Sequence, residues 1–348
     1  MSRVMSQQSA SETPSSEVPL PIPADVRAES PQAAPPPVQV HIQGLSKSYG
    51  GKTALSKLNL EVHEGDIFGF IGPNGAGKTT TLRILSALLL PTGGKALIAG
   101  IDVVQNPRQI KELVGYMPDS FGVYENMTLF EYLDFFGAAY KIPRTQRQMV
   151  IRDVLELTDL GSKQDDQVSA FSRGMKQRAC LAKTLLHDPK VLILDEPASG
   201  LDPRARIEFR ELLKELQRMG KTIIVSSHIL TELSTMCNTV GIIEAGKLVA
   251  AGAVEEILKS LRTTRMFVLD VLEVGDAPRA ADLIGKQDGA EVVESLGSAV
   301  RFGFSAANPD IAGLIDRLVA ERIRFTSFRE ELADLETAFM TLTNGRLA

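Results

Sequence analysis

The sequence predicts an α/β fold built on a parallel sheet, followed by a small second domain of α+β type. Two short runs, Ile67–Ile71 and Val191–Leu194, are apolar throughout. Such runs are typical of strands that are covered on both faces of a parallel sheet. A glycine-rich loop follows the first run, and after the loop a helical spacing is shown by Leu82, Leu85, Leu88 and Leu89. The loop therefore lies where a buried strand ends and a helix begins.

This loop fits the pattern G-x-x-x-x-G-K-[ST], which binds phosphate. Its residues are Gly72, Pro73, Asn74, Gly75, Ala76, Gly77, Lys78, Thr79 and Thr80. The glycines allow backbone N–H groups to turn toward phosphate oxygens, and the helix N-terminus adds partial positive charge. We predict that Lys78 reaches the β- and γ-phosphates and that the Thr79 hydroxyl ligates Mg²⁺.

Two carboxylates, Asp195 and Glu196, follow the second apolar run. They lie at the carboxyl end of a buried strand, where α/β sheets bind their ligands. We expect Asp195 to hold Mg²⁺ through water and Glu196 to polarise an attacking water. A further strand, Thr222–Val225, runs into Ser226, Ser227 and His228. If this strand neighbours the Asp195 strand, His228 is placed for a phosphate contact.

Three further segments surround these motifs in the sequence. Residues Met1–Pro37 are rich in Ser, Pro, Ala and Gln, which predicts a disordered tail. Tyr49 lies in a turn, where it either stacks on a purine or is an ordinary half-buried tyrosine. From Asp119 to Leu186 the patterns are mostly helical, and within this insertion Ser172 is the expected N-cap of a helix.

From Val40 to about Leu258 the chain resembles the nucleotide-binding subunit of an ATP-binding cassette (ABC) transporter. In that family a RecA-like phosphate-loop core carries an antiparallel β subdomain and a helical subdomain, here about residues 119–186. The motifs occur in the family's order: Walker A is 72–79, the signature loop is 172–175, Walker B is 191–195, the D-loop is 199–202 and the switch histidine is 228. The resemblance implies that Tyr49 stacks on adenine, that Glu196 is the catalytic glutamate, and that Asp202 belongs to the nucleotide site.

The same resemblance implies an ATPase that uses ATP and Mg²⁺ and acts as a head-to-tail homodimer. Each ATP would lie between Lys78, Thr79, Asp195 and Glu196 of one copy and Ser172 and Gly174 of the other. The partner would be an integral membrane permease on a separate chain, with this subunit in the cytoplasm against the inner face of the membrane. An exporter fits best; an importer ATPase, or a non-transport ABC ATPase acting on a soluble macromolecule, are the alternatives.

Two positions depart from the family pattern. The signature loop reads Ser172-Arg173-Gly174-Met175, where the family prefers a second glycine and a glutamine. Asp119 follows Val114–Pro118 at the place where the family has a glutamine near Mg²⁺. Carboxylate suits Mg²⁺, so Asp119 is expected either to reach the metal shell through water or to swing away while its loop hinges. The alternative is that Asp119 caps the next helix.

We expect three parts: the tail over 1–37, the cassette over 38–260 and an accessory domain over 261–348. The accessory domain reads β-α-β-β-α-β, which suggests a ferredoxin-like split βαβ unit with a final helix over Leu332–Leu342. Lys and Arg total 38 against 43 Asp and Glu, a net charge of −5 without a basic block, which argues against nucleic acid as a partner. No apolar run is long enough to span a bilayer.

Overall fold

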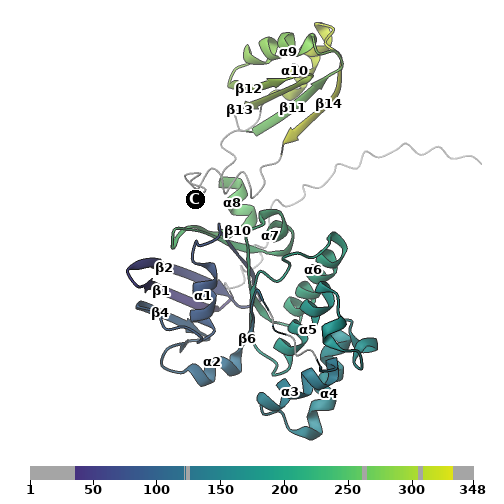
Figure 1. Cartoon of the computed structure of the whole chain (residues 1–348). Coiled ribbons are helices and arrows are strands. Elements are labelled where there is room, and N and C mark those ends of the chain that lie inside the picture. The colour runs from purple at the N-terminus through teal and green to yellow at the C-terminus, as the bar shows by residue number, and fades with distance from the viewer. Residues whose placement is uncertain (1–35, 121, 123–125, 261–264, 305–308, 332–348) are drawn as a thin grey trace, which may run out of the picture. The chain divides into compact units, whose positions relative to one another are not determined.

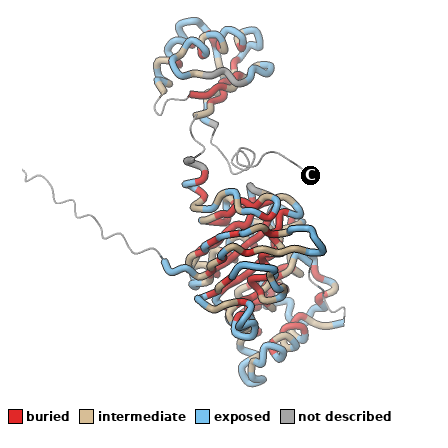
Figure 2. Tube along the Cα trace, turned by 90° about the vertical axis from the view of Figure 1, so that its left-hand side faces the viewer, coloured by how far each residue is buried: buried red, intermediate tan, exposed pale blue. Residues whose placement is uncertain are grey.

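The computed structural model describes residues 36–120, 122, 126–260, 265–304 and 309–331. The predicted tail therefore lies almost entirely outside the described residues, as does the helix expected over Leu332–Leu342. The cassette and the accessory domain each have a hydrophobic core of their own residues and are described in turn (Figures 1 and 2).

The centre of the cassette is a six-stranded sheet in the order β10-β9-β3-β8-β7-β6. Its strands are β3 (Ile67–Ile71), β6 (Val114–Met117), β7 (Val191–Asp195), β8 (Thr222–Ser227), β9 (Thr239–Glu244) and β10 (Lys247–Ala253). All neighbours pair in parallel except β10 and β9. Every residue of β3, β7 and β8 is buried, which confirms the prediction drawn from their apolar runs. Because β7 and β8 are neighbours, Asp195 and Glu196 at the end of β7 lie beside His228, which follows β8.

A second, antiparallel sheet has the order β2-β1-β4-β5. Its strands are β1 (Val38–Tyr49), β2 (Lys52–His63), β4 (Gly93–Ile98) and β5 (Ile101–Asp102), and the helices nearest in sequence are α1 (Lys78–Leu85) and α2 (Pro107–Leu113). Leu82 and Leu85 of α1 pack in the same core as this sheet. The helix ends earlier than the leucine spacing predicts, because Ala87 adopts a left-handed φ of 52°. Leu88 is consequently outside the helix and exposed.

The remaining cassette elements are mostly helical. They are α3 (Leu129–Ala139), α4 (Arg144–Leu157), the 3₁₀ turns Gly161–Lys163 and Val168–Ala170, α5 (Arg173–Leu185), α6 (Pro203–Arg218), α7 (Leu230–Met236) and α8 (Val254–Ser260). The helices α3, α4 and α5 contact one another and form the helical part (Figure 1). Ser172 accepts a hydrogen bond from the Met175 N–H, which confirms the predicted N-cap of α5.

The accessory domain has a four-stranded sheet in the order β12-β13-β11-β14. Its elements are β11 (Arg265–Val271), α9 (Asp276–Gly285), β12 (Ala290–Leu296), β13 (Ala299–Phe304), α10 (Ile311–Ala320) and β14 (Phe325–Glu331). All neighbouring strands are antiparallel, so β11 and β12 run parallel with β13 between them. This is the strand order of a split βαβ unit. Phe267 and Phe302 stack in its core with ring centroids 5.7 Å apart.

Candidate nucleotide site

The glycine-rich loop joins β3 to α1 in a conformation that requires glycine. Gly77 has a φ of 111°, and a methyl group there would lie 2.7 Å from Leu55 Cδ2 and 2.8 Å from the Ala54 carbonyl oxygen. A methyl group on Gly72 would collide with the Ile243 carbonyl. The loop is thus held tightly against β2 and β9. Helix α1 begins within the loop motif, with Lys78 as its first residue.

The loop forms one wall of a cavity of about 370 Å³. Its lining brings together segments that are far apart in the sequence: Ala54, Pro73, Asn74, Gly75, Gly77, Lys78, Thr79, Thr80, Asp119, Arg173, Glu196, Ser199 and His228. Both basic and acidic side chains belong to this lining. A cavity of this size, lined by a glycine-rich loop at the N-terminus of a helix and by a lysine, suits a phosphorylated ligand.

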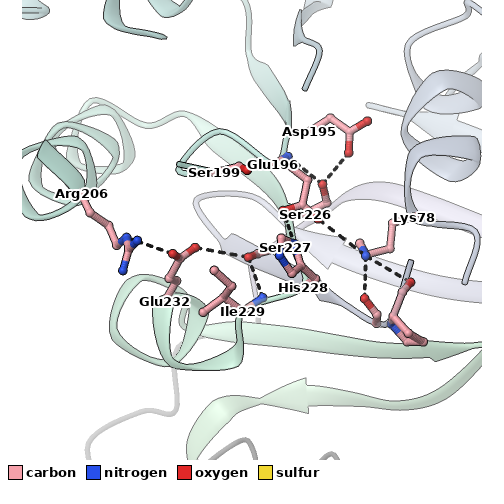
Figure 3. A network of polar contacts seen from close by, with 12 residues as sticks. Lys78, Asp195, Glu196, Ser199, Arg206, Ser226, Ser227, His228, Ile229 and Glu232 are labelled. Atoms are coloured by element: carbon pink, nitrogen blue, oxygen red, sulfur yellow. Dashed lines mark hydrogen bonds and ion pairs between the residues drawn. The ribbon is translucent and has the colours of Figure 1, made fainter. Parts of the chain in front are cut away.

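Lys78, Glu196 and His228 form a continuous row of contacts (Figure 3). Glu196 Oε2 lies 2.8 Å from His228 Nδ1, and Glu196 Oε1 lies 3.7 Å from Lys78 Nζ. Lys78 Nζ also donates hydrogen bonds to the carbonyls of Gly72 at 2.6 Å and Pro73 at 3.3 Å. Burial lowers the pKa of Lys78, while the negative charges of Glu196 and Asp195 oppose this shift. Three predicted site residues therefore meet at one point.

Asp195, the residue before Glu196, is fully buried. Its Oδ1 accepts a hydrogen bond of 2.6 Å from the Ser226 hydroxyl. Its Oδ2 is buried and has no hydrogen-bond partner among the described residues. A buried carboxylate oxygen without a partner is costly unless a cation or its water satisfies it. Thr79 lines the cavity, and a carboxylate and a hydroxyl are the kind of hard oxygen ligands that Mg²⁺ prefers.

A second polar group, which the sequence did not suggest, contacts Ser227, the residue before His228, from the next helix. Glu232 of α7 is buried; its Oε2 accepts a hydrogen bond of 3.3 Å from the Ser227 hydroxyl, and its Oε1 lies 2.9 Å from Arg206 Nε (Figure 3). Burial raises the pKa of Glu232, and the charge of Arg206 counteracts it. The contacts tie the segment after β8 to α6, which follows the D-loop.

The helix α5 also contacts the D-loop of the same chain. The buried side chain of Gln177 donates a hydrogen bond of 3.3 Å to the Ser199 carbonyl. The Arg173 guanidinium lies against Gly200, where an added methyl group would be 2.5 Å from Arg173 Cζ. Gly200 has a φ of 68°, so glycine provides both the conformation and the space. The arginine that departs from the family pattern thereby joins the signature loop to the D-loop and reaches the cavity wall.

Several predicted site residues lie outside the cavity lining. Tyr49 is 48% exposed at the end of β1, and Lys47 Nζ lies 5.1 Å from its ring centroid. Ser172 and Gly174 lie at the N-terminus of α5, and Asp202 caps α6 by accepting a hydrogen bond of 2.8 Å from the Ala205 N–H. The roles of these four residues stay predictions. The predicted contact of Ser172 and Gly174 with ATP would require the nucleotide of a second copy of the chain.

Asp119 lies in the cavity wall, and its Oδ1 accepts a hydrogen bond of 2.8 Å from the Ser120 N–H. The alternative in which it caps the next helix is wrong for the described residues. That helix, α3, begins at Leu129 and is capped by Thr128, whose hydroxyl accepts from the Glu131 N–H while Glu131 accepts from the Thr128 N–H. This reciprocal pair is a capping box, so the N-cap position of α3 belongs to Thr128 and not to Asp119.

The chain is similar to proteins of a known family. Residues 55–199 match the model of the ABC transporter family. The "Uncharacterized ABC transporter ATP-binding protein all4389" of Nostoc sp. is 39% identical over 60% of this chain, and the chain spans 63% of that relative's length. The "Nod factor export ATP-binding protein I" of Ralstonia nicotianae is 33% identical over 88% of this chain and 94% of its own length.

A solved structure, "Structure of ATP binding subunit of ABC transporter", has a TM-score of 0.59 at 28% identity. The similarity covers 64% of this chain and 93% of that one. None of the helices in the described part of the chain has the length and apolar character needed to cross a membrane.

Proposed function

This chain belongs to the family of ABC transporter ATP-binding proteins, and we propose that it powers export across a membrane by hydrolysing ATP. Family membership makes the cassette an ATPase that uses ATP and Mg²⁺. The observation that carries the proposal is the row Lys78–Glu196–His228 beside the phosphate loop. It places a cation, a carboxylate and an imidazole around one cavity.

Within the proposed site each side chain has one task. Lys78 and the N–H groups of the loop hold the phosphates, and bound Mg²⁺ neutralises negative charge on them. Asp195 and Thr79 are the residues that would hold the ion. Glu196 orients the attacking water, while His228, at 2.8 Å, fixes the position of its carboxylate.

The direction of transport is inferred from the length of the similarity. The relative named as a Nod factor export protein aligns over 308 residues, which is more than the cassette between residues 38 and 260 can contain. The similarity to an export ATP-binding protein therefore includes part of the accessory domain. We infer the same direction for this chain, with a membrane permease on a separate chain as its partner and the cytoplasmic face of the membrane as its location.

The proposed active form is a head-to-tail homodimer. Ser172 and Gly174 lie outside the chain's own cavity, although the family uses these positions to contact ATP. A two-fold axis would bring them over the nucleotide of the other copy, with the N-terminus of α5 directed at the γ-phosphate.

Mixing two inactive variants tests the proposed dimer. Neither Lys78→Ala nor Ser172→Ala alone leaves a complete site in a homodimer, so each is expected to lose ATPase activity. A mixed dimer has one site with both residues intact. Equal mixing should restore up to about a quarter of wild-type turnover, because about half of randomly paired dimers are mixed. Turnover that stays at the level of the separate variants would contradict a shared site; Lys111→Ala, an exposed lysine of α2, is the control.

We further propose that Asp119 contributes to the metal shell through a water. Asp119→Ala is then expected to raise the Mg²⁺ concentration that gives half-maximal ATPase activity, because one negative oxygen group near the ion is lost. Asp119→Gln should have a smaller effect. The measurement is an Mg²⁺ titration at saturating ATP. Identical titrations for both variants and the wild type would remove Asp119 from the metal shell.

A further inference from the structure

One buried hydroxyl connects both acids of the site. Ser226 lies on β8 directly opposite Asp195 of β7 in the parallel register, and both residues are fully buried. The Ser226 hydroxyl donates to Asp195 Oδ1 at 2.6 Å and accepts from the Glu196 N–H at 3.0 Å (Figure 3). The backbone N–H can only donate, so the single hydroxyl hydrogen is directed at the carboxylate.

The contact with Glu196 restrains an unusual backbone. Glu196 has a φ of 50°, in the left-handed region that non-glycine residues rarely occupy. Such a conformation costs energy and persists only where neighbouring groups fix it. Its N–H is held by Ser226 and its carboxylate by His228 Nδ1, so the residue is fixed at both ends.

The contact with Asp195 determines which of its two oxygens is left without a partner. The Ser226 hydroxyl satisfies Oδ1, while Oδ2 is buried without a hydrogen-bond partner among the residues that the structure describes. The carboxylate cannot rotate without breaking the bond to Ser226. The oxygen without a partner is therefore presented in a constant direction.

From this geometry we propose that Ser226 is a positioning residue for hydrolysis, which aligns the metal-holding acid and the water-orienting acid through one hydroxyl. The proposal rests on the function proposed above. It assigns to Ser226 no contact with ATP, because Ser226 is absent from the residues that line the cavity. Its loss should consequently affect turnover and metal use more than nucleotide binding.

The test compares Ser226→Ala with the wild-type chain. Turnover is expected to fall about 10- to 100-fold, since misplacing a catalytic group by a fraction of an ångström to one ångström has effects of this size. The half-maximal Mg²⁺ concentration should rise. The Kd for ATP, measured by equilibrium binding, should stay within about two-fold of wild type, because the phosphate loop is unchanged.

Ser86→Ala is the matched control, because Ser86 is also buried and its hydroxyl donates one hydrogen bond of 2.8 Å to the Leu82 carbonyl. A loss of stability alone would lower Tm in both variants and leave turnover well below Tm unchanged. Equal turnover and Mg²⁺ dependence for Ser226→Ala, Ser86→Ala and wild type would overturn the positioning role. A wild-type chain without ATPase activity would instead contradict the proposed function.

Discussion

Glu196→Gln is expected to reduce steady-state ATP hydrolysis by about 10²–10⁴-fold, the usual cost of losing a general base. The amide keeps the shape of the side chain but has no negative charge with which to polarise water. It also weakens the contacts with His228 Nδ1 and Lys78 Nζ, which lie 2.8 and 3.7 Å from the carboxylate. ATP binding should persist because the phosphate loop is untouched.

The measurement is phosphate release at saturating ATP and Mg²⁺, with Glu211→Gln as the control. Glu211 is an exposed residue of α6 that does not line the cavity, and its replacement should leave turnover unchanged. If Glu196→Gln turned over ATP at the wild-type rate, the role proposed for Glu196 would be wrong.

Lys78→Ala is expected to weaken ATP binding by about 10- to 100-fold, because hydrogen bonds from a charged donor to phosphate are among the stronger ones. The residue is 6% exposed, so water cannot readily replace the lost ammonium. The Kd for ATP should be measured directly, with Lys111→Ala as the exposed control. An unchanged Kd would show that Lys78 does not bind the phosphates of ATP.

The same site predicts the direction of a pH effect. Burial lowers the pKa of the Lys78 ammonium, so its charge is lost at a lower pH than that of an exposed lysine. Affinity that depends on this charge is complete below the lowered pKa and decreases as pH rises through it. Lys78→Ala should show no such decrease, and an equal decrease in both proteins would assign the effect to other groups.

Much of the phosphate side of the site could be predicted from local sequence. The loop pattern follows directly on one apolar strand, and the two acids follow directly on another, so each motif can be recognised from a short segment. The parallel sheet brings the ends of β7 and β8 together as expected. The N-cap role of Ser172 was predictable for the same reason, because capping depends on neighbours in sequence.

The contacts that depend on register and side-chain reach could not be predicted. Nothing in the sequence places the Ser226 hydroxyl on Asp195 rather than one residue away, because that requires the alignment of two strands 31 residues apart. The contact of Arg173 with Gly200 similarly depends on where α5 packs. The end of α1 at Leu85 was missed because a left-handed Ala87 is not visible in an apolar pattern.

In the homodimer that we propose, two copies enclose ATP between them. Light scattering of Glu196→Gln, with ATP and Mg²⁺ and then without nucleotide, measures this association, because slow hydrolysis should preserve the closed form. The mass is expected to double with ATP and to return to that of one chain without it. ATP that binds, as shown by equilibrium binding in the same sample, while the mass stays that of one chain would rule out a nucleotide site shared by two copies.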